Sequence, residues 1–188
     1  MTQMIIIGGG INGVATAYHL ARKGMTVRVI EKQHLGSMAS GWTLGGVRQS
    51  GRHHAELPLA LSAVGEWQGL SDQLKSDTGY VQSGNMRLAR TEQEATFITT
   101  MVAEQRSKGL SLDLLSGDEA RQHAPALSDS ITLASLCPSD GFANPLATVH
   151  AYAQAAQQFG AHILEHCAAL EITTHNGRIT GVETSAGH

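Results

Sequence analysis

The amino-terminal sequence MIIIGGGING (residues 4–13) joins a short apolar run to a cluster of glycines. An apolar run rich in β-branched side chains is typical of a buried parallel strand. From Asn12 to Lys23 apolar residues recur at helical spacing, and Gly24 stands where a glycine commonly ends a helix. The sequence TVRVIE (residues 26–31) then has the pattern of a second strand. Together these residues predict a compact βαβ unit with a right-handed crossover.

Within this unit Gly8, Gly10 and Gly13 match the spacing G-x-G-x-x-G. Such glycines allow a tight turn, a close approach of a pyrophosphate to the backbone, and close packing of helix on strand. Free amides at the helix start would hold the diphosphate. Glu31 closes the second strand eighteen residues after Gly13, where a carboxylate can bind an adenosine ribose and would repel a 2′-phosphate. The pattern predicts a dinucleotide site; a tight βα turn in another α/β protein is the structural alternative.

A second glycine-rich stretch, SGWTLGGVR (residues 40–48), follows soon after the second strand. FAD and NAD share the first fingerprint, but a nicotinamide dehydrogenase has no obvious use for this second stretch. The longer flavin dinucleotide needs further backbone contacts beyond its pyrophosphate. The two stretches flanking Glu31 therefore favour FAD, with a nicotinamide dehydrogenase or a flavin hydroxylase as the enzymatic alternatives.

Composition restricts the classes of partner. The 188 residues allow one domain, or a domain with an incomplete second one. A formal charge of −3 and an aromatic content of 4% offer neither the basic surface nor the stacking platform of a nucleic-acid-binding protein. We find no signal-peptide pattern and no apolar segment long enough to span a bilayer. Two cysteines thirty residues apart fit neither a zinc ribbon nor a disulfide framework, so we expect a cytoplasmic protein.

The remaining chain alternates between helical and strand patterns. Helices are expected at residues 57–74, 91–109, 116–125 and 144–160, the second and third with capping boxes and the fourth capped by Asn144 before Pro145. Strands are expected at residues 80–89, 131–136 and 161–165, and a hairpin at 170–184 turns at Asn176-Gly177. Residues 34–54 have no period and predict an ordered loop.

Several stretches in combination resemble a known family. They are GGGINGVATAYHLARKG (8–24), ASGWTLGGVR (39–48), SGNMRLARTEQE (83–94), DGFANP (140–145) and GRITGVETSAG (177–187). These are similar to segments of the FAD-dependent amine and amino-acid oxidoreductases. This D-amino acid oxidase-like superfamily includes glycine oxidase, D-amino acid dehydrogenase and sarcosine oxidase, and the chain resembles the β subunit of heteromeric sarcosine oxidase.

The resemblance implies an α/β fold. A Rossmann-type FAD-binding domain with a parallel sheet would comprise residues 1–78 and 144–188, and residues 79–143 would form part of a mixed-sheet substrate domain. It also implies oxidation of the C–N bond of a secondary amine or small amino acid, with sarcosine-like substrates the first choice. The substrate would lose a hydride to the flavin, the imine would be hydrolysed, and oxygen or another electron acceptor would reoxidise the flavin.

The resemblance also assigns cofactor-binding residues. It places Ile11 and Asn12 at the pyrophosphate, Glu31 and Lys32 at the adenosine, Ser40 and Gly41 near the diphosphate, Gly45, Gly46 and Val47 beside the flavin, and the Ala169 backbone at the adenine. Some relatives attach the flavin covalently through a Trp-His pair in the second loop. This chain has Trp42-Thr43 there, so that linkage is absent at this position.

Arg48 lies just beyond the second loop, where relatives place a basic residue near the flavin ring. Its charge would stabilise the anionic reduced flavin, which makes Arg48 the catalytic candidate. A surface arginine that pairs with Glu56 or with the loop backbone is the alternative, and Arg52 is the weaker candidate. His53 and His54 are adjacent, so in an extended segment they would face opposite ways, and we expect solvated or capping histidines.

The sequence HILEH (residues 162–166) matches the H-x-x-E-H string of zinc proteases. That chemistry needs both histidines on one face of a helix, whereas this stretch reads as a strand with no third ligand nearby. We therefore predict no metal site. The resemblance runs out at residues 184–188, about halfway along a typical member. We expect a fragment or a chain completed by a partner subunit, with weak or absent activity alone; a noncatalytic FAD-binding subunit is the non-enzyme alternative.

Overall fold

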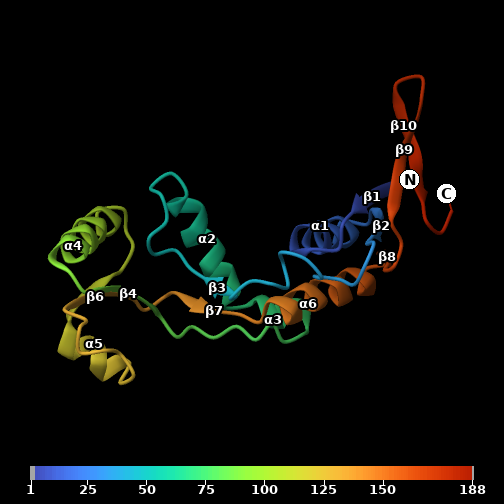
Figure 1. Cartoon of the computed structure of the whole chain (residues 1–188). Helices are drawn as coiled ribbons and strands as arrows, with labels where there is room; N and C mark the ends of the chain where they lie inside the picture. The colour runs from blue at the N-terminus through green and yellow to red at the C-terminus, as the bar shows by residue number, and fades with distance from the viewer. Residues whose placement is uncertain (1–2, 188) are drawn as a thin grey trace. The chain divides into compact units, whose positions relative to one another are not determined.

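The computed structural model describes residues 3–187, which form two compact units (Figure 1). Unit 1 contains the described residues up to Gly45, then Gly69–Gly79, and those from Asn144 onward. Unit 2 contains Gly46–Gln68 and Tyr80–Ala143. Each unit has its own sheet and its own buried apolar residues.

Unit 1 is built on a parallel sheet. Its strands are β1 (Gln3–Ile7), β2 (Thr26–Ile30) and β8 (His162–Leu164), in the order β1-β2-β8. Both strand pairs are parallel, so each connection must cross over, and helices α1 (Ile11–Arg22) and α6 (Pro145–Gln158) lie within these connections. The predicted α/β fold with a parallel sheet is confirmed.

Helices α1 and α6 bury small and aromatic residues in unit 1. Val14 packs with Leu35, Val149 and Ala153 in one buried cluster. Tyr18 is almost fully buried, and its ring meets the ring of Tyr152 edge to face at 5.7 Å, a favoured aromatic geometry. The cluster thus fixes α1, whose N-terminus follows the glycine turn.

An antiparallel hairpin completes the described part of unit 1. It pairs β9 (Ala169–His175) with β10 (Arg178–Thr184), shown in red in Figure 1. Asn176 and Gly177 both have positive φ, 49° and 73°, as a two-residue type I′ turn requires. The predicted hairpin and its turn are confirmed. Unit 1 also contains the short helix α3 (Leu70–Leu74).

Unit 2 has a three-stranded antiparallel sheet in the order β4-β6-β5. Its elements are β3 (Gly46–Val47), α2 (Leu57–Trp67), β4 (Asn85–Ala89), α4 (Glu92–Arg106), β5 (Asp113–Ser116), α5 (Gly117–His123), β6 (Leu133–Cys137) and β7 (Gly141–Phe142). A separate antiparallel pair joins β3 to β7. The predicted capping boxes of α4 and α5 are both present.

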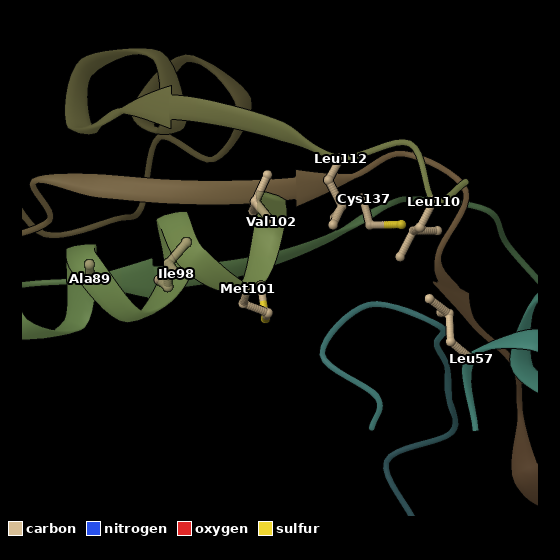
Figure 2. Packing of buried hydrophobic residues seen from close by; sticks show 8 residues of the cluster. All are labelled: Leu57, Ala89, Ile98, Met101, Val102, Leu110, Leu112 and Cys137. Carbon is tan, nitrogen blue, oxygen red and sulfur yellow. The ribbon is translucent and has the colours of Figure 1, made fainter. Parts of the chain in front are cut away.

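The core of unit 2 lies between α4, the sheet and the start of α2 (Figure 2). From α4 come Ile98, Met101 and Val102, which are three and four positions apart and therefore share a face. Leu57, the first residue of α2, is 1% exposed and packs into the same cluster. Met101 is 9% exposed, and its flexible side chain fills part of this core.

Three sequence-based predictions of elements were wrong in extent. The helix expected at residues 57–74 is two helices, because the chain turns at Gln68 and Gly69. The strand expected at 80–89 begins only at Asn85, although Val81 makes an isolated bridge to Phe142. The loop expected at 34–54 contains the two-residue strand β3.

The two units divide the chain differently from the domains expected above, because residues 46–68 group with unit 2. Two contacts account for this grouping: β3 pairs with β7, and Leu57 packs into the core of unit 2. Among residues 3–187, no helix is long and apolar enough to cross a membrane.

Candidate functional site

The glycines after β1 form a turn that larger residues could not form. Gly8 has a φ of +107°, and its amide donates to the carbonyl of Ile30 at 2.8 Å. A Cβ on Gly13 would collide with the backbone carbonyl of Gly8. A Cβ on Gly9 would meet a methyl of Leu35 at 2.5 Å. The turn therefore requires a bare backbone at Gly8 and Gly13, whereas a side chain at Gly9 would displace the Leu35 side chain.

The N-terminus of α1 presents unpaired backbone amides beside this turn. Gly10 is the N-cap residue, and it has no side chain to accept from them. The Ile11 amide donates to Ser40 Oγ at 3.0 Å. The backbone amides of Asn12 and Gly13 have no hydrogen-bond acceptor within residues 3–187. The first turn of α1 also has no acidic residue to offset the helix dipole. Such an end attracts an anion, and a diphosphate fits it.

Glu31 lies directly at this turn. Its Oε2 accepts from the Gly9 amide at 2.7 Å, and its Oε1 accepts from the Gln33 amide at 2.8 Å. The residue is 8% exposed. Because each carboxylate oxygen has two lone pairs, both oxygens can accept a further hydrogen bond from a hydroxyl. The arrangement thus places a carboxylate that can accept further hydrogen bonds next to a turn whose free amides can donate to an anion.

The segment after β2 closes over the glycine turn. The Gly36 amide donates to the carbonyl of Gly9 at 3.0 Å. Glu165, which follows β8, accepts from the Leu35 amide at 2.7 Å. These bonds connect residues far apart in the chain and fix one wall of the glycine turn, formed by Leu35, Gly36 and Glu165 beside Gly9.

The H-x-x-E-H string belongs to this wall. Its first residues form strand β8, as expected, and its Glu165 lies 3.7 Å from the Nδ1 of His34. The ring of His166 meets that of His34 edge to face at 4.4 Å. Within residues 3–187, no group of three His, Cys, Asp or Glu side chains could hold a metal ion. Glu165 is instead a structural acceptor.

Ser40 and Gly41, predicted near the diphosphate, lie against the same turn. Ser40 Oγ is 3.0 Å from the place of a Cβ on Gly10, and a Cβ on Gly41 would collide with the carbonyl of Gly36. Besides Glu31, the residues predicted to contact the adenosine were Lys32 and Ala169, and within residues 3–187 they are not hydrogen-bonded to the turn as Glu31 is. Lys32 is exposed, and Ala169 packs against the buried cluster of Ile30, Cys167 and Val182.

The predicted flavin-end residues continue from unit 1 into unit 2. Gly45 has a φ of +69°, and its amide donates to Thr43 Oγ1 at 3.3 Å. Gly46 and Val47 form β3 in unit 2, where Val47 is buried and pairs with Gly141. Contacts of these residues with a flavin stay a prediction.

Arg48 follows β3 and lines a pocket of about 430 Å³ in unit 2 with Arg52, Glu56 and the apolar face of α2. The guanidinium of Arg52 lies 3.8 Å from the carboxylate of Glu56, as the alternative interpretation had it. Arg48 makes no ion pair with any described residue. The uncompensated positive charge of this pocket is therefore that of Arg48.

His53 and His54 are exposed, as expected of solvated or capping histidines, but their rings do not face opposite ways as they would in an extended segment. Their ring centroids lie 4.0 Å apart at an interplanar angle of 39°. The segment is not extended: it turns into α2, and His53 Nδ1 accepts from the Ala55 amide at 3.3 Å. Both rings line a second pocket of unit 2, of about 320 Å³.

Sequence reasoning missed three residues at or beside the glycine turn. Gly9 supplies the amide that binds Glu31, while Gln33 and Glu165 complete the surrounding hydrogen bonds. The run of three glycines was a usable signal for Gly9, because the fingerprint explains only the first and third. Backbone donation by Gln33 leaves no signal in the sequence.

Comparison with known proteins gives a consistent result. The profile of the DAO family, described as FAD dependent oxidoreductase, matches residues 3–188. The chain is 30% identical over 192 residues to sarcosine oxidase subunit beta of Rhizobium meliloti, covering 98% of this chain and 46% of that protein. It is 28% identical over 189 residues to the mitochondrial pyruvate dehydrogenase phosphatase regulatory subunit of Mus musculus, covering 98% and 21%.

A solved structure agrees with these relatives. Glycine oxidase from Bacillus cereus matches with a TM-score of 0.91 and 31% identity, covering 100% of this chain and 52% of that one. The chain thus spans about half, or less, of the length of these three proteins.

Proposed function

Because the chain belongs to the FAD-dependent oxidoreductase family, we propose that unit 1 binds the adenosine diphosphate part of FAD at the glycine turn. The observation that carries this proposal is the Glu31 carboxylate, held 2.7 Å from the Gly9 amide beside the unpaired amides of α1. The diphosphate would accept hydrogen bonds from Asn12 and Gly13. The ribose hydroxyls would donate to Glu31.

We further propose that the whole protein oxidises the C–N bond of a secondary amine or small amino acid. When bound, FAD supplies a hydride acceptor for the carbon that bears the nitrogen. Support comes from the two relatives named after sarcosine and glycine, each about 30% identical. Sarcosine-like substrates are our first choice, and the Rhizobium relative, itself a subunit, supports a partner subunit.

Arg48 has the chemistry of a charge-stabilising group in this reaction. Its guanidinium is not neutralised by an ion pair with any described carboxylate, and it lines a pocket with an apolar wall formed by α2. A positive charge in partly apolar surroundings stabilises a developing negative charge more than it would in water. We propose that Arg48 plays this part beside the reduced flavin.

A noncatalytic FAD-binding subunit is the second candidate. It is favoured by the 28% identity to a protein named as a phosphatase regulatory subunit. In that case the turn at Gly8 and Glu31 would serve the same cofactor, and Arg48 would have no role in turnover.

Flavin absorbance separates these proposals. We expect the purified chain, mixed with FAD and freed of excess ligand, to retain flavin absorbance. Sarcosine, glycine or D-alanine added without oxygen, with and without a candidate partner chain, should then bleach it if the protein is an amine oxidoreductase. Flavin that is retained but never bleached by any amine would favour the noncatalytic subunit. A protein that retains no flavin would contradict the cofactor proposal.

A further inference from the structure

The turn that follows β3 is held from two sides by buried polar side chains. It consists of Gln49, Ser50, Gly51 and Arg52, with the Arg52 amide donating to the Gln49 carbonyl at 3.4 Å. Gly51 has a φ of +66°, as the third position of a type II turn requires. A Cβ at Gly51 would displace the Arg87 guanidinium, and its positive φ would be strained with any other residue. The backbone of this turn is thus tightly restricted.

Asp140 holds the first half of the turn. Its Oδ1 accepts from the Gln49 amide at 2.8 Å, and its Oδ2 accepts from the Ser50 amide at 3.2 Å and from the Ser50 hydroxyl. The residue is 0% exposed, and no cation makes an ion pair with it in the described part of the chain. A fully buried carboxylate is costly unless its hydrogen bonds are satisfied, and here the turn supplies them.

Gln105, near the end of α4, holds the second half. Its Oε1 accepts from the Gly51 amide at 3.0 Å, and its Nε2 donates to the Arg52 carbonyl at 3.0 Å. The residue is 6% exposed. One primary amide thus satisfies a donor on Gly51 and an acceptor on Arg52, which fixes the two peptide groups on either side of the Gly51–Arg52 peptide.

The turn lies within the part of unit 2 that bears the two candidate arginines. Arg48 comes directly before it and Arg52 ends it, and both line the pocket of about 430 Å³ beside α2. The Arg52 Nε donates to the Arg48 carbonyl at 3.4 Å, so the two residues are also linked to each other. Movement of the turn would therefore move both guanidinium groups.

We propose that Asp140 and Gln105 are positioning residues: they clamp the turn at residues 49–52 so that Arg48 and Arg52 face the pocket beside α2. Neither residue lines that pocket. The use of this arrangement in catalysis rests on the proposed function, whereas the clamp itself is a property of unit 2.

Trypsin tests the clamp directly, because it cleaves after Arg48 and Arg52. We expect cleavage of the folded chain at these two sites to be roughly tenfold faster in Asp140→Asn and Gln105→Met, since each variant frees part of the turn. Gln105→Glu keeps the acceptor for the Gly51 amide and should give an intermediate rate. Mass spectrometry of the first peptides released identifies the sites.

Thr148→Val is the matched control, because it removes a buried hydroxyl that donates to the Asn144 carbonyl at 2.8 Å in unit 1. It should leave cleavage after Arg48 and Arg52 within about twofold of the parent rate. Cleavage after Arg48 and Arg52 at the parent rate in both Asp140→Asn and Gln105→Met would overturn the proposal. An equal increase after Arg22 in α1 would also overturn it, because the variants would then loosen the whole chain.

The midpoint potential of the bound flavin distinguishes residues that position Arg48 from residues that only stabilise the turn. In FAD-loaded protein, Arg48→Gln, Asp140→Asn and Gln105→Met should all lower the midpoint potential of the flavin. Each variant removes the positive charge of Arg48 from beside the anionic reduced ring, or moves it away. Faster cleavage with an unchanged potential would overturn the positioning role. A parent chain that takes up no FAD would contradict the proposed function and the flavin role of the clamp, while trypsin would still decide whether the clamp holds the turn.

Discussion

Replacing Glu31 perturbs the dinucleotide turn at its centre. The Glu31→Ala variant removes both acceptors of the Gly9 and Gln33 amides, which are bound at 2.7 and 2.8 Å. Because the residue is 8% exposed, water cannot freely replace the carboxylate. The Glu31→Gln variant keeps one acceptor oxygen and loses the other.

The magnitude follows from these two bonds. A hydrogen bond to a charged group contributes about 1.5–3 kcal/mol to stability, and an unpaired buried donor costs a similar amount. We therefore expect Glu31→Ala to lower the free energy of unfolding of unit 1 by about 3 kcal/mol and Glu31→Gln by about half of that. Loss of the ribose contact should also weaken FAD binding by at least about tenfold in Glu31→Ala.

Urea unfolding and amide hydrogen exchange measure the two consequences. Exchange at Gly9 and Gln33 should accelerate about tenfold or more in Glu31→Ala, while amides in the core of unit 2 keep the parent rate. Glu171→Gln, an exposed change on β9, is the control and should alter stability by less than about 0.5 kcal/mol. A Glu31→Ala protein with parent stability and parent exchange at both amides would refute this reasoning.

Three further predictions follow from the geometry. Gly13→Ala should abolish FAD retention in a gel-filtration assay, because its Cβ collides with the Gly8 carbonyl; retention at the parent level would show that the turn can relax. Hydrogen bonds from the Arg90 and Thr91 amides lower the pKa of Glu94 below its ordinary 4.5. The stabilisation of α4 by the ionised Glu94 is therefore complete above pH 4.5 and is lost as the pH falls below that value. The stability of α4 measured against pH should show this loss, and Glu94→Gln should remove it; an unchanged profile in the variant would contradict the assignment. Burial raises the pKa of the Cys137 thiol, so Ellman's reagent should label it at pH 8 only on unfolding, and rapid labelling of the native chain would contradict its burial.

The sequence predicted the local elements of unit 1 well because each depends on neighbouring residues. The strand and helix at residues 4–22, and the hairpin turn at Asn176-Gly177, depend on apolar period and on the backbone freedom of glycine and asparagine. The break at Gln68 and Gly69 was missed because a glycine inside a helical pattern is compatible with either outcome. The two-residue strand β3 has no period at all, and only its pairing with β7 reveals it.

The candidate site was predictable where a motif specifies it. The spacing of Gly8, Gly10 and Gly13 with Glu31 was readable, and the structure brings these residues together. The clamp was not readable. Gln105 and the turn it holds are more than fifty positions apart, and a glutamine in a helix has no local signature of a long-range bond. The adjacent histidines misled because facing direction depends on backbone conformation, which their sequence does not determine.

Competition binding tests the central claim, that the turn and Glu31 hold the adenosine diphosphate half of a dinucleotide. FAD is titrated into the purified chain by calorimetry, alone and then in the presence of excess ADP or excess FMN. We predict that excess ADP displaces FAD from the parent chain and that excess FMN does not, because FMN lacks the adenosine that Glu31 would bind. Displacement by FMN with none by ADP, or no binding of FAD at all, would contradict the claim.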